Sequence, residues 1–249
     1  MSKTRVIILA AGRGSRMGQA TSDKPKCLTV LNNRTLLSWQ LDAIRTAGLS
    51  EINIVKGYKP EMITGDFNEF NNNRWSETNM VYSLFCAPDF DGDTIISYSD
   101  IVYHSDHIEK LKEASGDLVI TADKDWLDLW SLRFEKPLDD AETFKTKNGE
   151  LIEIGKKTES FDDIEAQFMG LIKLSKKGWH LLKDIFHELP QDKSDSLDMT
   201  SMLNLVLKTN QSVETVFIQG KWCEADSMED LMAYETELKK NPNWKHDWR

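Results

Sequence analysis

A short apolar run, residues 6–11, leads directly into a loop that is rich in glycine and basic residues. The apolar run has the length and composition of a buried strand, and Gly12, Gly14 and Gly18 break it into a loop. Between residues 13 and 26 this loop sets four cations, Arg13, Arg16, Lys24 and Lys26, against one acid, Asp23. The whole chain has a formal net charge of −10. The local reversal of sign therefore indicates a site for an anion such as a polyphosphate.

Strand-like and helix-like segments alternate through the first half of the chain. Strands are expected at residues 4–9, 52–55, 94–98 and 118–121, and helices at residues 35–47, 79–87 and 105–114, the last capped by Ser105. This alternation predicts a Rossmann-like, mostly parallel sheet that is flanked by helices. Ligands of such sheets bind beyond the carboxyl ends of the strands. The glycine loop and Asp100 are therefore expected at the same edge of the sheet.

The alternation fails from residue 123 to about residue 165, where aromatic residues are interspersed with charges, and an acceptor-side subregion is expected over about residues 123–175. Strands expected at residues 151–154 and 168–174 predict a smaller antiparallel subregion on the acceptor side of the site. Helices at residues 176–187, 197–207 and 227–238 and a strand at 213–218 follow, and the tail after Asn241 is expected to fray. Because no linker is evident, residues 1–249 are expected to form a single domain.

Composition excludes several classes of protein. The acidic balance argues against nucleic-acid binding and against binding to an anionic membrane. No apolar run is long enough to span a membrane or to form the core of a signal peptide. Cys27, Cys86 and Cys223 lack metal-ligand spacing, which favours a reduced, cytoplasmic protein. A homodimer is compatible with the sequence, which does not fix the oligomeric state.

The glycine loop is neither of two common phosphate-binding motifs. Met17 stands where a dinucleotide fingerprint needs its third glycine, and no Gly-Lys-Ser/Thr follows. Exposed amides at residues 12–15, together with Arg13 and Arg16, still suit a triphosphate. Pro25 stiffens the approach of Lys26 to such a ligand. The alternative is an ordinary strand-to-helix turn with solvated charges.

The segment Leu9-Ala10-Ala11-Gly12-Arg13-Gly14-Ser15-Arg16-Met17, with Lys24-Pro25-Lys26, resembles the signature of the nucleotidyltransferases that activate sugar 1-phosphates and related small phosphates. The resemblance implies that the loop wraps the base and phosphates of a nucleotide. It also implies that Arg16 holds the β- and γ-phosphates and that Lys26 neutralises the reacting phosphates.

A second stretch, with Asn72, Thr78-Asn79 and Tyr82-Ser83-Leu84, resembles a segment of the bacterial phosphocholine cytidylyltransferases, although Thr78 and Met80 depart from it. This resemblance implies CTP as the nucleotide. The nucleotide-binding residues that it implies are Leu9, Ala11, Gly12, Arg13, Gly14, Ser15, Arg16, Asn72, Thr78, Asn79 and Ser83.

Two aspartates, Asp100 and Asp226, are the candidate metal ligands. Carboxylates combined with substrate phosphates provide the oxygen ligands that Mg²⁺ prefers. The resemblance matches both to the metal-binding aspartates of the family, although Ser99 replaces the glycine that usually precedes the first. The alternative is that Asp100 caps a turn and Asp226 merely precedes the helix cap Ser227.

The acceptor side is assigned from Lys156, Lys173 and Trp130. The segments Ile154-Gly155-Lys156-Lys157 and Met169-Gly170-Leu171-Ile172 resemble family segments beside the acceptor phosphate, so Lys156 is expected to bind that phosphate and Lys173 to lie near it. An exposed charge at a strand end is the alternative for Lys156. The rings of Trp126, Trp130 and Phe134, with the acids Asp125, Asp128 and Glu135, could hold an ammonium group by cation–π attraction, or the rings could belong to the core.

Together these features predict a cytidylyltransferase that moves CMP from CTP to a small phosphorylated or phosphonate acceptor and releases pyrophosphate. Acceptors of the phosphocholine, phosphorylated amino-acid and aminoalkylphosphonate types remain open. Arg16, Lys26 and Lys156 are the expected catalytic residues, and Mg²⁺ is the expected cofactor. The alternatives are a sugar-1-phosphate nucleotidyltransferase that uses UTP or dTTP, and a non-catalytic nucleotide-binding relative.

Overall fold

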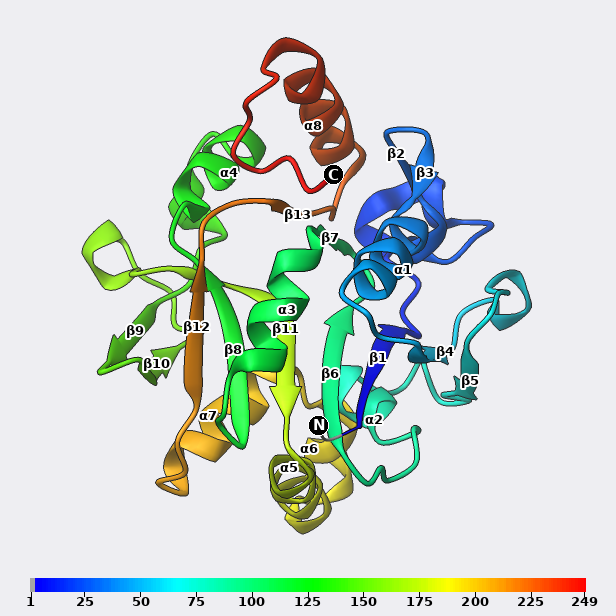
Figure 1. Cartoon of the computed structure of the whole chain (residues 1–249), viewed down its shortest axis with the longest axis vertical. Helices are drawn as coiled ribbons and strands as arrows, with labels where there is room; N and C mark the ends of the chain where they lie inside the picture. Colours follow the sequence, from blue (N-terminus) through cyan, green and yellow to red (C-terminus); the bar gives the residue numbers. More distant parts are fainter. Residues whose placement is uncertain (1–2) are drawn as a thin grey trace.

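The computed structural model describes residues 3–249, and within them one nine-stranded sheet forms the centre of the molecule, with strands in the order β5-β4-β1-β6-β11-β8-β12-β10-β9 (Figure 1). The strands are β1 (Thr4–Ala10), β4 (Glu51–Lys56), β5 (Asn68–Asn71), β6 (Asp93–Tyr98), β8 (Leu118–Asp123), β9 (Phe144–Lys147), β10 (Glu150–Ile154), β11 (Gln167–Leu174) and β12 (Glu214–Ile218). β5, β4, β1 and β6 are mutually parallel, as are β8 and β12. The predicted Rossmann-like, mostly parallel sheet is confirmed.

β11 reverses direction in the middle of this sheet, because it pairs antiparallel with both β6 and β8. It therefore lies between two sets of parallel strands, β5-β4-β1-β6 and β8-β12, and both sets run in the same direction. The antiparallel hairpin β9–β10 extends the sheet at one edge. The expected antiparallel strands are thus confirmed, and both the hairpin and residues 168–174 lie within the nine-stranded sheet.

Helices cover both faces of the sheet, which explains why β1 reads as a continuous apolar run. α1 (Leu36–Thr46) and α3 (Ser105–Glu113) pack into one hydrophobic cluster, and α2 (Met80–Leu84), α5 (Lys176–Glu188) and α7 (Met199–Lys208) into the other. The cap of α3 was predicted wrongly: the Nδ1 atom of His104 accepts the bond from the Asp106 amide, and Ser105 is already helical. Within residues 3–249, no helix combines the length and apolarity that a membrane crossing requires.

A two-stranded ladder beyond the carboxyl ends of the main strands brings distant segments together. It pairs β7 (Ile101–Tyr103) with β13 (Trp222–Glu224), and α4 (Trp126–Arg133) and α8 (Met228–Lys240) lie beside it (Figure 1). Asp123, at the end of β8, is fully buried and fixes this ladder: one carboxylate oxygen accepts the Gly220 amide at 2.9 Å and the other accepts the Trp222 indole N–H at 2.8 Å. The main sheet therefore holds β13 rigidly in place.

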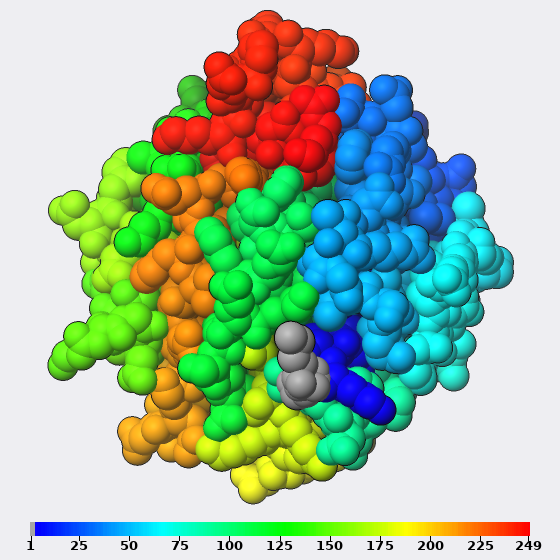
Figure 2. All heavy atoms as spheres, viewed as in Figure 1, coloured from blue at the N-terminus to red at the C-terminus, as the bar shows by residue number. Residues whose placement is uncertain are grey.

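The chain after Asn241 is packed rather than frayed, which corrects the prediction. His246 and Trp248 are almost completely buried, and the Trp248 ring lies edge-on to Trp39 of α1 at a centroid distance of 5.9 Å. The Lys245 carbonyl accepts the Lys221 amide, which leads into β13, at 2.7 Å. In the space-filling view this tail, in red, lies against the blue segment that contains α1 (Figure 2).

Replacing Trp248 with alanine should lower the free energy of unfolding by about 3–5 kcal/mol, because a fully packed indole is lost and a cavity remains. Urea denaturation measures this. Met232→Ala on α8 is the matched control, because the Met232 side chain is 56% exposed and its loss should cost less than about 0.5 kcal/mol. A Trp248→Ala variant as stable as the control would show that the tail contributes little to the fold.

Candidate active site

The ammonium of Lys26 lies between the two aspartates that were predicted to bind metal. Its Nζ atom is 2.8 Å from Asp100 Oδ2 and 2.6 Å from Asp226 Oδ1. Burial acts to lower the pKa of Lys26, but the two carboxylates more than offset this and raise it. The structure therefore brings three predicted site residues into direct contact.

Gly14 shows why the loop over Lys26 needs glycine. Its φ angle is +73°, and a Cβ atom at this position would lie 2.7 Å from the Cβ of Lys26. Any side chain here would therefore be strained and would also collide with the lysine stem. Glycine lets the loop close over the lysine and present its amides at the same edge of the sheet.

Two arginines complete the charge balance around Asp226. Arg16 reaches Asp226 Oδ1 at 2.8 Å from the glycine loop, and its side chain is 69% exposed, so it is free to contact a ligand. The buried Arg133 reaches Asp226 Oδ2 at 3.1 Å, and Glu224 and Asp230 at 3.3 Å each. Although burial acts to raise the pKa of Asp226, Lys26 and Arg16 help to hold it well below its usual range.

Arg133, Glu224 and Asp230 were missed by the sequence prediction. The run of acids at positions 224, 226 and 230 signals that a buried cation is needed, but nothing in the sequence selects Arg133 at the end of α4 as that cation. Asp230 also accepts the amides of Asp226 and Ser227, at 2.8 and 3.0 Å, and so completes the capping box of α8, whose N-cap is Ser227 as predicted. Asp226 is thus fixed through both its backbone and its carboxylate.

Asp100, Glu224 and Asp226 form a carboxylate cluster that suits a divalent cation. Each contributes an oxygen, and these atoms lie within 4.8 Å of one another. Asp100 Oδ1 is buried and has no hydrogen-bond partner among residues 3–249, so it can still accept a ligand. Burial and the adjacent Asp226 and Asp100 raise the pKa of Glu224 against the opposing effect of Arg133. A bound cation would relieve this repulsion.

A cavity of about 270 Å³ opens beside this cluster, along the glycine loop. Most of the predicted nucleotide-binding residues line it, namely Leu9, Ala11, Gly12, Gly14, Ser15, Arg16, Thr78, Asn79 and Ser83. The prediction missed Trp75, Met80, Tyr98 and Ser99 in this wall. Arg13 does not line it; its guanidinium stands 5.6 Å from the centre of the Tyr58 ring.

Asn72 also lies outside the cavity wall, but it organises that wall. Its buried side-chain amide donates to Thr78 Oγ1 at 2.9 Å and to Ser83 Oγ at 3.0 Å, and both of these residues line the cavity. Its carbonyl oxygen accepts the Arg74 amide at 2.8 Å. Asn72 therefore orders the segment that carries Thr78, and it is a positioning residue in this structure.

A second cavity, of about 170 Å³, lies on the other side of the carboxylate cluster. It is lined by Arg16, Trp130, Asp140, Glu142, Thr143, Phe144, Ile154, Gln167, Phe168, Thr200, Glu224 and Asp226. Arg16 lines both cavities. Asp100 lines only the first cavity, and Asp226 lines only the second. Two ligands could therefore meet at Lys26 and its carboxylates.

The three residues that were predicted to bind the acceptor lie in different parts of the structure. Trp130 lines the second cavity, and the amide of Lys156 borders it by donating to Thr143 Oγ1 at 3.2 Å. The Lys156 ammonium is exposed and pairs with Glu153. Lys173 was predicted wrongly: because β11 runs antiparallel, Lys173 lies at the amino ends of β6 and β8, where it bonds the Ala114 carbonyl.

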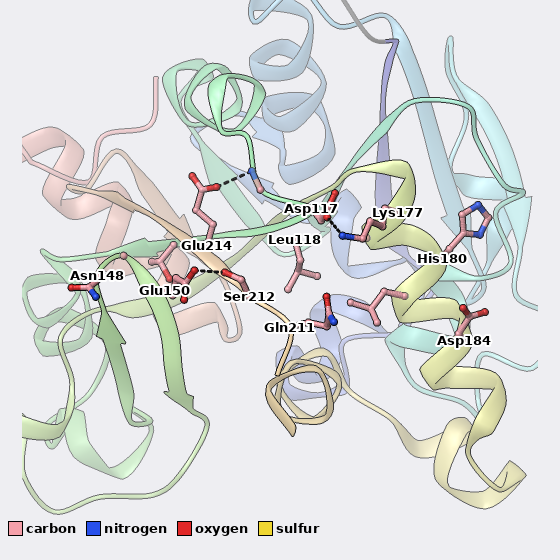
Figure 3. A pocket seen from close by; sticks show the side chains of 15 residues that line it. Asp117, Leu118, Asn148, Glu150, Lys177, His180, Asp184, Gln211, Ser212 and Glu214 are labelled. Carbon is pink, nitrogen blue, oxygen red and sulfur yellow. Dashed lines mark hydrogen bonds and ion pairs between the residues drawn. The ribbon is translucent and has the colours of Figure 1, made fainter. Parts of the chain in front are cut away.

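A larger cavity, of about 780 Å³, lies at this amino-terminal edge (Figure 3). None of the three clustered carboxylates lines it. Three of its acids are already engaged: Asp117 with Lys177, Glu150 with Ser212, and Glu214 with the Gly116 amide. Its walls hold no glycine loop and no carboxylate triad within the part of the chain that is described. The chemistry therefore concentrates at the carboxyl edge of the sheet.

Several known proteins are similar to this chain in sequence or in fold. Residues 6–149 match the family model of the MobA-like NTP transferase domain. The chain is 39% identical over 244 residues to the CTP:phosphoglutamine cytidylyltransferase of Campylobacter jejuni, which covers 90% of this chain and 96% of the relative. The inositol-1-phosphate CTP transferase from T. maritima has a TM-score of 0.76 at 18% identity, with 98% of each chain covered. The CTP:phosphocholine cytidylyltransferase from Streptococcus pneumoniae has a TM-score of 0.70 at 17% identity, covering 95% of this chain and 99% of that one.

Replacing Arg133 with methionine should destabilise the protein by about 3–5 kcal/mol, because Glu224, Asp226 and Asp230 would lose their shared buried cation. Urea denaturation gives the change. Lys177→Met is the control, since Lys177 pairs with Asp117 on the surface and its loss should cost at most about 1 kcal/mol. Equal effects of the two substitutions would contradict a stabilising role for Arg133.

Proposed function

The chain belongs to the MobA-like NTP transferase family, and from this premise we propose that it transfers a cytidylyl group from CTP to a small phosphorylated amino-acid derivative and releases pyrophosphate. The relative from C. jejuni supports this assignment, because it aligns over nearly the whole chain and its name specifies CTP and phosphoglutamine. The site supports it independently, because two cavities meet at one cluster of charged residues.

The observation that carries the proposal is the junction of the two cavities at Arg16, Lys26 and Asp226. A nucleotide along the glycine loop would place its triphosphate beside Lys26, and an acceptor in the second cavity would approach from the other side of Asp226. An oxygen of the acceptor phosphate then attacks the α-phosphorus in line, and pyrophosphate leaves. This geometry would hold the acceptor phosphate and the α-phosphate of the nucleotide next to each other, so that they react as bound neighbours and not as two free anions that repel each other.

The reaction needs no covalent intermediate on the protein. Cys27 adjoins Lys26 in the sequence, but burial raises the pKa of its thiol to about 12, so it stays protonated and does not act as a nucleophile. Catalysis instead depends on charge stabilisation. Lys26 lowers the repulsion between the two phosphates, and Arg16 and the amides of residues 12–15 hold the leaving pyrophosphate.

We also propose Mg²⁺ at the carboxylate cluster. Asp100, Glu224 and Asp226 would hold it, and the buried, unpartnered Oδ1 atom of Asp100 fits that role. When bound, the ion orients the α-phosphate and offsets its charge. Lys156 is proposed to bind the acceptor phosphate from the rim of the second cavity, where its amide is already held by Thr143.

Replacing Lys26 with alanine should lower kcat/KM by about 10²–10³-fold, the usual cost of removing a group that stabilises developing charge. Initial rates of pyrophosphate release measure this, and circular dichroism checks that the variant is folded. Lys24→Ala is the control: it changes a cation of the same loop that lies outside both cavities, and its rate should stay within about threefold of wild type. A Lys26→Ala variant as active as the control would remove Lys26 from the reaction.

The substrate assignment is tested by measuring pyrophosphate release from CTP, UTP, ATP and GTP, each with phosphoglutamine, phosphocholine and glucose 1-phosphate. CTP with phosphoglutamine should give the highest kcat/KM, and phosphorus NMR should detect a diphosphate-linked product. Faster turnover of UTP with glucose 1-phosphate would identify a sugar nucleotidyltransferase instead. Nucleotide binding without pyrophosphate release from any pair would contradict the enzymatic assignment.

A further inference from the structure

Glu142 is an acid in the second cavity with no role so far. It follows the 3-10 turn Pro137–Asp139, and its backbone carbonyl accepts the Gln167 side-chain amide at 2.6 Å, which fixes the main chain here. The side chain is half-buried and lines the cavity. Across residues 3–249, no hydrogen bond or ion pair reaches its carboxylate.

The groups around Glu142 do not supply the missing counter-charge. Burial raises the pKa of its carboxyl group, Lys157 opposes this, and Asp140 and Asp198 reinforce it. The Lys157 ammonium is itself directed at the carbonyls of Asp139 and Asp140, at 3.2 and 3.3 Å. Asp198 is engaged as the cap of α7. Arg16, the cation in the cavity wall, pairs with Asp226. The Glu142 carboxylate is therefore left without a hydrogen-bonded counter-charge.

The rings that were predicted to hold an ammonium group, Trp126, Trp130 and Phe134, do not form a free cation–π face in this cavity, because only Trp130 lines it. The guanidinium of Arg133 stands 5.1 Å from the centre of the Trp130 ring and 4.9 Å from that of Phe134. The Trp130 indole N–H donates to Asp140 Oδ2 at 3.0 Å. A trimethylammonium group needs open aromatic faces, because it has no N–H to donate. A carboxylate without a partner instead suits a cation that donates hydrogen bonds.

We propose that Glu142, with Asp140 beside it, binds an ammonium group of the acceptor that carries N–H donors, and so selects phosphorylated amines over neutral acceptors and over quaternary ammonium acceptors. The inference rests on the proposed function for the identity of the cavity as the acceptor site. Within that site it assigns Glu142 as a specificity-determining residue. It also limits the acceptor to compounds with a primary or secondary amine at the end remote from the phosphate.

The test compares three acceptors in the presence of CTP: phosphoglutamine, its desamino analogue and its N-trimethyl analogue. The wild-type protein should show a kcat/KM for phosphoglutamine about 10- to 100-fold above either analogue, the range expected for a hydrogen bond between charged groups. Glu142→Gln should remove this preference by raising KM for phosphoglutamine alone, with little change in kcat. A wild-type protein that uses the N-trimethyl analogue equally well would overturn the proposal.

Glu159→Gln provides the matched control. Glu159 is an exposed acid of the same irregular stretch and is outside the cavity wall, so the preference among the three acceptors should survive its substitution. A Glu142→Gln variant that loses activity equally with all three acceptors would show a purely structural role and would also overturn the proposal. Thermal melting of both variants checks that the fold is retained.

Titration calorimetry of the same three compounds separates this inference from the proposed function. If no acceptor yields pyrophosphate but phosphoglutamine still binds more tightly than its analogues, and Glu142→Gln abolishes the difference, the ammonium site stands while the assigned reaction fails. Equal affinity of the three compounds for the wild-type protein, or the absence of binding by all of them, would reject the ammonium site itself.

Discussion

The site depends on one buried interaction, the contact of the Lys26 ammonium with Asp100 and Asp226. Lys26 and Asp226 are 200 positions apart in the chain, yet their charged atoms lie 2.6 Å apart. Such a group of charges is costly to bury, and it is tolerated only where every member is held in place. Much of the architecture at the carboxyl edge of the sheet serves that requirement.

Two further sets of contacts hold the acidic residues of the site together. Asp123 ties the turn before β13 to the end of β8, and the packed chain after Asn241 bonds the same turn from outside. Arg133 then joins α4 to Glu224, Asp226 and Asp230. The carboxylates are thus arranged by the fold before any ligand binds, which is the condition for electrostatic catalysis without a large reorganisation.

The sequence was most informative where function depends on local patterns. The glycine loop, Asp100 and Asp226 follow strands of a regular α/β alternation, so their shared edge could be predicted, and the structure places them together. The prediction for Lys173 failed because the sequence pattern assigned residues 168–174 to an acceptor-side subregion. β11 instead lies between β6 and β8 in the main sheet, antiparallel to both, and this carries Lys173 to the opposite edge. Arg133 and Glu142 lie in the irregular stretch, where only tertiary packing selects their partners. The tail was misread because its two tryptophans, Trp244 and Trp248, find their contacts on α8 and α1.

The most direct test of this account is a crystal structure of the chain with CTP and Mg²⁺. We expect the triphosphate to lie along residues 12–16, the ion to be held by Asp100 and Asp226, and Lys26 to contact the α-phosphate. The cavity that contains Glu142 should open onto the α-phosphorus from the side opposite the leaving pyrophosphate. Nucleotide bound in the cavity at the amino-terminal edge, or a triphosphate directed away from Lys26, would contradict the account.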